Sequence, residues 1–249
     1  MVMKVFGLVG RGIGHSFSAG FFNDKFRREG REAEYRPFDL NDISQLKGIL
    51  DHTPGLCGLN VTSPYKREVI PFLDSLSPEA QALQAVNTIE VISNPDGTRT
   101  FRGHNTDCPG FGMTLEGLVA PGTEALVLGT GGASSAVQLA LTKRGISYHV
   151  VSRSPRQNEI SYKEADELIP SAILIINATP VGMHPHVEEY PDIDYDKISA
   201  DHICYDLIYN PSETLFLKKA SRNGAKTVNG LQMLHNQANL SWEIWQRNL

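Results

Sequence analysis

The chain has 249 residues and a formal net charge of −5, and 41% of its residues are hydrophobic while 20% are charged. This composition is typical of a soluble globular protein with one or two domains. The acidic balance, with no basic stripe, argues against nucleic acid or an anionic membrane as a partner. The sequence shows no membrane span or signal sequence near its start, and its three cysteines are widely spaced. We therefore expect a cytoplasmic protein with free thiols.

Short apolar segments alternate with longer amphipathic ones over the first hundred residues. We predict strands at 3–10, 33–40 and 55–63 and helices at 18–30, 42–50 and 65–76, the last with a break at Pro71. The segments 85–93 and 98–105 flank a Pro-Asp-Gly turn and are predicted to form an antiparallel hairpin. The repeated alternation of strand and helix favours a mainly parallel sheet covered by helices.

The same alternation starts again after the hairpin. We predict strands at 125–129, 147–153, 172–179, 201–209 and 225–230, and helices at 106–118, 132–145, 212–224 and 231–246. The sequence thus predicts an α/β protein with two domains. The second domain is expected to cover 106–230, and the last helix to pack back on the first, which then comprises 1–105 plus 231–249.

Two glycine-rich stretches are candidates for a dinucleotide-binding turn. In "LVLGTGGASSA", Gly129 and Gly131 match the first two glycines of the dinucleotide-binding fingerprint, and a predicted helix follows at once. About twenty residues further on, a NAD-binding unit carries an acid, but this chain has Ser152-Arg153-Ser154 there. A guanidinium suits the 2′-phosphate of NADP, so we predict NADP as the cofactor. The alternative is a basic surface loop.

The second stretch, "GLVGRGIGHSFS" at residues 7–18, fits the fingerprint less well. Its turn runs into polar and aromatic residues rather than into a helix start built from small residues. Two hydroxyls, Ser16 and Ser18, are suited to binding one small carboxylate. The alternative is that one of these serines caps the helix that follows.

Eight motifs occur in order along the chain: "HSFS" at 15–18, "NVTSPYK" at 60–66, "AVNTI" at 85–89, "GHNTD" at 103–107, "GTGGAS" at 129–134, "NATPVGM" at 177–183, "YDLIYNP" at 205–211 and "NGLQMLHNQA" at 229–238. Through them the chain resembles the shikimate dehydrogenase family over nearly its whole length. The resemblance implies an N-terminal substrate domain, a C-terminal Rossmann-type NADP-binding domain and a cleft between them. The implied reaction is the reversible NADPH-dependent reduction of 3-dehydroshikimate to shikimate, a step of aromatic amino acid biosynthesis.

The resemblance also implies which residues carry this reaction. Lys66 and Asp107 match the family's catalytic lysine and aspartate, a pair suited to orienting the substrate and moving a proton. Taken alone, Lys66 would be read as a surface charge and Asp107 as a helix cap. The implied ligands of the substrate are Ser16, Ser18 and Tyr209 for its carboxylate, and Asn60, Thr62, Asn87 and Gln237 for its ring hydroxyls.

The resemblance implies contacts with NADP(H) from three further groups of residues. The implied cofactor ligands are Gly129, Gly131, Gly132 and Ala133 at the phosphates, Ser152, Arg153 and Ser154 at the adenosine end, and Thr179, Gly182, Ile208 and Gly230 near the nicotinamide. We expect no metal, because the polar cluster at 184–189 is typical of a solvated loop. The protein is expected to act on small molecules as a monomer or a homodimer.

The chain departs from the usual pattern of the family in its first loop. Arg11-Gly12 stands where Asn-Pro or a similar pair is usual, and Thr130 replaces a common alanine in the nucleotide loop. Two alternative functions stay open. One is a quinate/shikimate dehydrogenase that prefers NAD, against which the missing acid argues. The other is a catalytically silent NADP-binding regulatory protein, against which the presence of both Lys66 and Asp107 argues.

Overall fold

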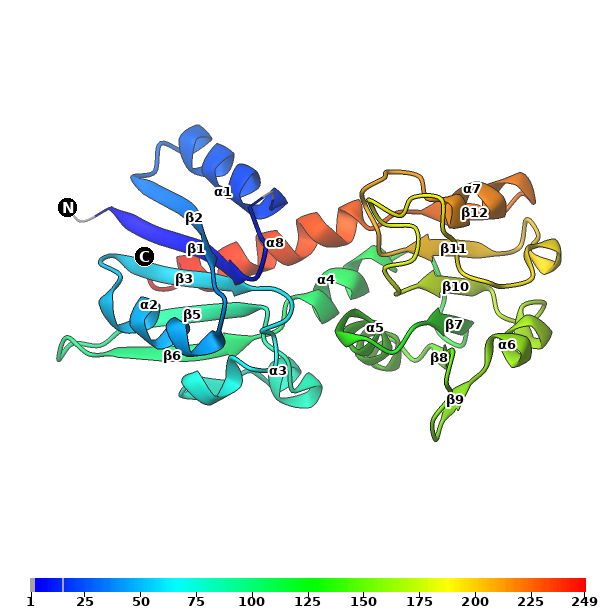
Figure 1. Ribbon diagram of the computed structural model, residues 1–249, viewed down its shortest axis with the longest axis horizontal. Coiled ribbons are helices and arrows are strands. Elements are labelled where there is room, and N and C mark those ends of the chain that lie inside the picture. Colours follow the sequence, from blue (N-terminus) through cyan, green and yellow to red (C-terminus); the bar gives the residue numbers. More distant parts are fainter. Residues whose placement is uncertain (1–2, 15) are drawn as a thin grey trace. The chain divides into compact units, whose positions relative to one another are not determined.

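The computed structural model describes residues 3–14 and 16–249, and the chain divides into two compact units (Figure 1). One unit runs to Thr106 and also includes Ala238–Leu249, and the other is Asp107–Gln237. Helix α8 (Leu231–Gln246) contributes to both units. The division within this helix therefore lies after Gln237, later than the boundary at residue 231 that we expected. Among the described residues, no helix is long and apolar enough to cross a membrane.

The first unit is built on a six-stranded sheet of mixed direction. Its strands are β1 (Lys4–Gly10), β2 (Ala33–Asp39), β3 (Leu56–Val61), β4 (Ser75–Leu76), β5 (Thr88–Ser93) and β6 (Arg99–His104), in the spatial order β2-β1-β3-β5-β6-β4. β1 pairs in parallel with β2 and β3, and β4 with β6. β5 pairs antiparallel with β3 and β6. The predicted hairpin is confirmed.

Both faces of this sheet are covered because the side chains of its strands alternate between two apolar clusters. Val5 and Val9 of β1 belong to the cluster that includes Leu46 and Leu50 of α2 (Leu46–His52). Phe6 belongs to the opposite cluster, together with residues of α1 (Phe17–Arg28) and Trp245 of α8. The C-terminal half of α8 thus packs on the first unit, as the sequence predicts.

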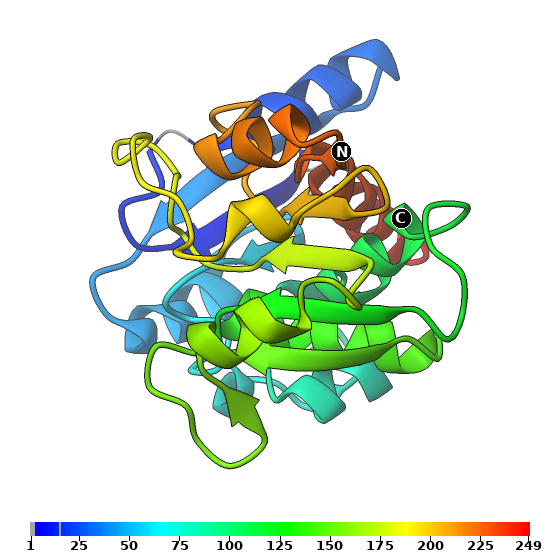
Figure 2. The ribbon, with the colours of Figure 1, turned by 90° about the vertical axis from the view of Figure 1, so that its right-hand side faces the viewer.

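The second unit is built on a parallel sheet of six strands. They are β7 (Glu124–Leu128), β8 (Ser147–Val151), β9 (Glu159–Ile160), β10 (Leu174–Asn177), β11 (Ile203–Asp206) and β12 (Lys226–Val228), in the order β12-β11-β10-β7-β8-β9. Figure 2 shows these strands side by side, coloured from green to orange. This unit has the doubly wound α/β architecture that the sequence predicts.

The central strands of the second sheet are apolar throughout because both of their faces are buried. Helices α6 (Tyr162–Leu168) and α7 (Leu215–Arg222) share one cluster with Leu126 and Cys204. On the other face, Phe111 of α4 (Asp107–Thr114) contacts the ring of Tyr205, and α4 packs against α5 (Gly132–Lys143). The two sets of helices thus enclose the sheet.

The helix predicted at 65–76 is wrong. The segment forms turns, a short 3-10 helix at Ile70–Phe72 and strand β4. Only Val69 donates a backbone hydrogen bond of the α-helical kind, to Tyr65, before the pattern tightens. Pro71 has no backbone N–H to continue a helix, and the chain beyond it joins the sheet instead. The structure also contains α3 (Pro78–Leu83) and α6, which we did not predict.

Candidate functional site

The residues expected to bind the cofactor follow neighbouring strands at one edge of the second sheet. The N–H of Gly129, after β7, donates to Val151 O of β8 at 2.9 Å. The N–H of Ala178, after β10, donates to Leu128 O at 2.9 Å, and the N–H of Leu207, after β11, donates to Asn177 O at 3.0 Å. The carboxyl ends of four parallel strands are therefore in register, as in the ligand-binding edge of open α/β sheets.

The loop between β7 and α5 has the geometry that a phosphate-binding turn needs. Gly129 has a φ of 106°, and a Cβ there would lie 2.8 Å from Thr179 Cγ2. Gly131 is the N-cap of α5 and supplies no side-chain cap, so no side chain there competes for the first N–H groups of the helix. Gly131 and Gly132 are exposed, with open space where a Cβ would stand. This loop fits a dinucleotide phosphate.

A basic segment follows the neighbouring strand. Ser152, Arg153 and Ser154 come directly after β8, and the hydroxyl of Ser152 accepts a hydrogen bond from Ser154 N at 3.2 Å. Arg153 and Ser154 are exposed. Since Gly129 is hydrogen-bonded to the last residue of β8, the phosphate loop and this segment lie next to each other. The segment can offer a guanidinium and hydroxyls to a phosphate, and it has no carboxylate that would repel one.

A buried hydrogen-bond network joins the loops after β10 and β11. Asp206 is fully buried, and its Oδ1 accepts hydrogen bonds from Asn177 Nδ2 at 3.1 Å and from Ile208 N at 3.0 Å. Its Oδ2 accepts from the Thr214 hydroxyl at 2.6 Å. Burial raises the pKa of Asp206 to about 6, although these three hydrogen bonds act in the opposite direction.

The same network determines where Thr179 lies. Asn177 Oδ1 accepts hydrogen bonds from Thr179 N at 3.1 Å and from its hydroxyl at 2.6 Å. The N–H of Gly230 donates to Ile208 O at 3.0 Å, and any Cβ at Gly230 would overlap the Leu207 carbonyl. The network thus brings together three of the positions expected near the nicotinamide, namely Thr179, Ile208 and Gly230.

Sequence reasoning missed the residues that form this network. Asn177 and Asp206 lie inside two of the family motifs, and Thr214 follows them in the chain. Asn177 and Asp206 carry a usable signal, because each is a polar residue that ends a strand of mostly apolar side chains. A polar side chain that ends a buried strand is itself buried, so it needs hydrogen-bond partners.

In the first unit, a cluster of buried polar side chains surrounds Asn60. Asn60 Nδ2 donates to Ser241 Oγ at 3.0 Å and to Thr88 Oγ1 at 3.2 Å, while its Oδ1 accepts from the Tyr35 hydroxyl at 2.9 Å. Asn87 Oδ1 accepts from Thr106 N at 2.8 Å. The structure thus groups two predicted substrate ligands, Asn60 and Asn87, in one network of amides and hydroxyls.

Other expected substrate ligands of this unit lie on its loops. Lys66 is half-buried in the turn after β3, where its carbonyl accepts a hydrogen bond from Val86 N at 2.7 Å. Thr62 directly follows β3 and donates its N–H to Val9 O at 2.9 Å. Ser16 is the N-cap of α1 and accepts from Ser18 N at 3.2 Å, which confirms the capping alternative for Ser16. The carboxylate role of the two serines stays a prediction.

The remaining predicted residues belong to the second unit. Asp107 is the first residue of α4 and follows Thr106 directly. Gln237 lies on α8 beside α4, because a Cβ on Gly110 would come within 3.0 Å of Gln237 N. Tyr209 follows β11 and is 40% exposed. Lys66 and Asp107 belong to different units, so their pairing stays a prediction.

Comparison with known proteins identifies the family. Residues 8–89 match the family model of the shikimate dehydrogenase substrate binding domain. The shikimate dehydrogenase (NADP(+)) of Caldanaerobacter subterraneus subsp. tengcongensis is 36% identical in an alignment that covers 97% of this chain and 91% of that protein. The chain belongs to the shikimate dehydrogenase family.

Solved structures of shikimate dehydrogenase family proteins share the fold. The shikimate dehydrogenase of Thermus thermophilus in complex with NADP(H) and shikimate is 32% identical, with a TM-score of 0.85 over 99% of this chain and 95% of that one. The quinate dehydrogenase of Corynebacterium glutamicum in complex with NAD is 29% identical, with a TM-score of 0.86 over 98% and 94%. The chain is similar to both enzymes, so overall similarity to these two structures does not distinguish shikimate from quinate as the substrate.

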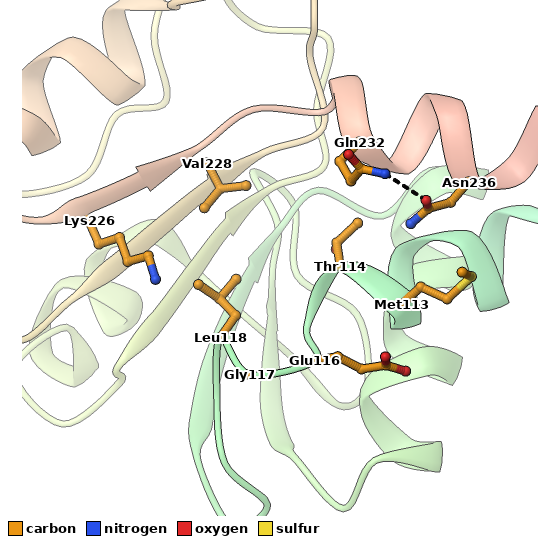
Figure 3. A pocket seen from close by; sticks show the side chains of 9 residues that line it. All are labelled: Met113, Thr114, Glu116, Gly117, Leu118, Lys226, Val228, Gln232 and Asn236. Atoms are coloured by element: carbon orange, nitrogen blue, oxygen red, sulfur yellow. Dashed lines mark hydrogen bonds between the residues drawn. The ribbon is translucent and has the colours of Figure 1, made fainter.

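This shikimate dehydrogenase family member also has an open pocket of about 420 Å³ within its second unit (Figure 3). Its walls combine apolar, amide and charged side chains, from Met113, Thr114, Glu116, Gly117, Leu118, Lys226, Val228, Gln232 and Asn236. Figure 3 shows Gln232 and Asn236 of α8 joined by a hydrogen bond of 2.8 Å. None of the predicted site residues lines this pocket, so it is distinct from the proposed cofactor site at the carboxyl edge of the second sheet.

Proposed function

We propose that the protein is an NADP-dependent oxidoreductase that acts on a CH–OH group and catalyses the reversible reduction of 3-dehydroshikimate to shikimate. Similarity to proteins named shikimate dehydrogenase (NADP(+)) over 97% of the chain supports the reaction. The observation that carries the cofactor is the segment Ser152-Arg153-Ser154 beside the glycine loop, because an arginine in that place suits a 2′-phosphate.

The second unit would bind NADP(H) along the carboxyl edge of its sheet. The N-terminus of α5, with Gly129, Gly131, Gly132 and Ala133, would hold the phosphates. Thr179, Gly182, Ile208 and Gly230 would line the nicotinamide. When bound, the cofactor supplies the hydride for the ketone. The chain itself would bind and orient the two ligands and shield them from water. Asp206 and Asn177 hold in place the loops that would surround the nicotinamide.

The first unit would bind the substrate, which fits the family model over residues 8–89. Ser16, Ser18 and Tyr209 would take the carboxylate, and Asn60, Thr62, Asn87 and Gln237 the ring hydroxyls. A buried set of amides and hydroxyls selects a polyhydroxylated ring because an analogue without the hydroxyls leaves these groups unpaired.

Lys66 and Asp107 would complete the chemistry. The reduction of a ketone needs a proton for its oxygen as well as a hydride for its carbon. An ammonium group is a suitable proton donor, and a nearby carboxylate keeps the ammonium charged and oriented. The half-buried position of Lys66, in a turn whose carbonyl is tied to Val86, supports this assignment.

A quinate dehydrogenase that prefers NAD is the second candidate, and the similarity to the Corynebacterium glutamicum enzyme supports it. The residues after β8 favour the first candidate, because a NAD enzyme usually carries an acid there. We also propose that the protein acts in the cytoplasm as a monomer or a homodimer, which light scattering after gel filtration would distinguish.

The deciding experiment measures initial rates with shikimate or quinate and with NADP or NAD. We expect the highest kcat/KM for shikimate with NADP. The proposal is overturned if quinate with NAD is the better pair. Binding of NADP without any reduction or oxidation of substrate would instead support a silent regulatory protein.

A further inference from the structure

Arg11, in the loop between β1 and α1, makes a compact set of contacts with a tyrosine far along the chain. Its Nε and Nη2 atoms donate to the Tyr65 hydroxyl at 3.2 Å and 3.0 Å. Its Nη2 also donates to Asn41 O at 2.6 Å, and its guanidinium carbon lies 5.5 Å from the centre of the Tyr65 ring. All of these atoms belong to the first unit.

Tyr65 is held on every side. Only 1% of its surface is exposed, and its hydroxyl donates to Leu40 O at 2.8 Å while it accepts from Arg11. Its side chain also belongs to the apolar cluster under the sheet. A tyrosine with a filled hydrogen-bond shell and a buried ring is a rigid anchor for its own backbone.

The residue that follows this anchor is Lys66. The backbone on its other side is also tied, because the carbonyl of Lys66 accepts a hydrogen bond from Val86 N at 2.7 Å. The Cα of Lys66 therefore lies between two fixed points. A side chain that must meet a reacting atom benefits from this, since small displacements of a catalytic group lower turnover strongly.

The loop that carries Arg11 is itself shaped to present it. A Cβ on Gly10 would lie 2.6 Å from Thr62 Cγ2, so glycine allows this loop to approach the turn after β3. Gly12 has a φ of 67° and donates its N–H to Asp39 Oδ1 at 2.8 Å. Proline in place of Gly12 would allow neither this positive φ nor this hydrogen bond, because proline has a fixed negative φ and no backbone N–H.

We propose that Arg11 is a positioning residue for Lys66, acting through the Tyr65 hydroxyl, and this inference rests on the proposed function. A planar guanidinium reaches the hydroxyl and the Asn41 carbonyl at once, whereas a lysine ammonium offers a single point of charge. The competing role for Arg11 is direct binding of the substrate carboxylate, and the two roles give different kinetics.

The test compares the variants Arg11→Ala, Arg11→Lys and Tyr65→Phe, the double variant Arg11→Ala/Tyr65→Phe, and Arg28→Ala as an exposed arginine control on α1. We expect Arg11→Ala and Tyr65→Phe each to lower kcat by about fivefold or more, with both KM values within about twofold. Because the two residues act as one unit, the double variant should be no slower than the slower single variant. Arg11→Lys should recover part of the loss.

Two results would overturn the inference. An unchanged kcat in Arg11→Ala is one. The other is a higher KM for shikimate in Arg11→Ala with a normal Tyr65→Phe, which would assign Arg11 to the substrate. Circular dichroism and thermal unfolding identify any variant that fails to fold, and Tyr65→Phe then decides, since it removes only the hydroxyl.

A second measurement does not depend on activity. The rate at which an amine-acylating reagent modifies Lys66, read by mass spectrometry against Lys47 in the same sample, should change in Arg11→Ala and in Tyr65→Phe but not in Arg28→Ala. Equal Lys66 rates in all proteins would contradict the positioning role. If the unaltered protein has no activity with shikimate, the proposed function fails, and this measurement still tests the link between Arg11 and Lys66.

Discussion

The Asp206 carboxylate accepts a 2.6 Å hydrogen bond from the Thr214 hydroxyl, which ties the end of β11 to the start of α7. Thr214 is the N-cap of α7 and also accepts a hydrogen bond from Leu217 N at 3.4 Å. Because Asp206 holds Asn177 and Ile208 as well, one buried acid organises the loops on which we place the nicotinamide.

This acid should make stability depend on pH. Burial raises the pKa of Asp206 from 3.8 to about 6 in the folded protein. Between these values the folded state binds the proton that the unfolded state has lost, so this group's contribution to stability falls as the pH rises from 3.8 to 6. The contribution lost is about 3 kcal/mol, from the size of the shift.

We expect Asp206→Asn to remove this dependence. The free energies of unfolding of the variant and of the unaltered protein are measured in urea at each pH. The value for the variant minus the value for the unaltered protein should rise by a few kcal/mol between about pH 4 and pH 7. Comparing the two proteins at each pH cancels the titration of all other groups. A difference that is constant over this range would contradict the role assigned to burial.

Replacing the proposed catalytic lysine should lower turnover without loss of cofactor. For Lys66→Ala we expect kcat to fall by about a hundredfold or more, since proton transfer by a placed group typically contributes that much. The affinity for NADPH, followed by its fluorescence, should change little. Lys47→Ala is the control, because Lys47 is an exposed lysine of the same unit. Near-normal turnover in Lys66→Ala would refute the assignment.

The basic segment after β8 should decide the choice of nucleotide. For Arg153→Ala we expect the KM for NADP to rise about tenfold or more while the KM for NAD stays within about twofold, because a charge-assisted hydrogen bond to phosphate is lost. Arg156→Ala is the matched control, because Arg156 is a second exposed arginine two residues beyond this segment. Equal increases for both nucleotides would show that Arg153 does not contact the 2′-phosphate.

Two glycines of the first unit should respond in opposite directions to the same substitution. A Cβ on Gly58 of β3 would overlap the indole of Trp245, whereas a Cβ on the exposed Gly48 of α2 would meet nothing within 4 Å. Gly58→Ala should therefore reduce the free energy of unfolding by about 1–3 kcal/mol, the usual effect of overpacking a core. Gly48→Ala should raise it by up to about 1 kcal/mol, the helix preference of alanine over glycine. Urea unfolding of both variants is the measurement, and shifts of the same sign would count against this packing.

The two helices that we did not predict, α3 and α6, are each marked by a local capping signal in the sequence. Ser161 caps α6 and Glu164 reaches back to it, a capping box that can be seen as Ser-x-x-Glu in the sequence. Ser77 caps α3, with Pro78 at its first position. Both signals lie in short helices with few apolar residues, where a search for apolar periodicity finds little.

The wrong helix at 65–76 has the opposite cause. Its apolar spacing is real, but Tyr65 and Val69 are spaced to bury themselves under the sheet from a series of turns. A pattern of apolar residues states which side chains are buried, and in an irregular segment it does not state the backbone that buries them.

The sequence by itself determined most of the strand and helix alternation, the turn of the hairpin at Asn94–Gly97, the glycine loop after β7 and the family. These depend on residues close together in the chain or on motifs in fixed order, so neighbouring residues are enough to define them. Tertiary structure alone decided that Asp206 joins Asn177, Ile208 and Thr214, and that Arg11 meets Tyr65, 54 positions away. Contacts of this kind form only when separate strands are brought together, because a buried polar group takes whichever partners the packed chain places within reach.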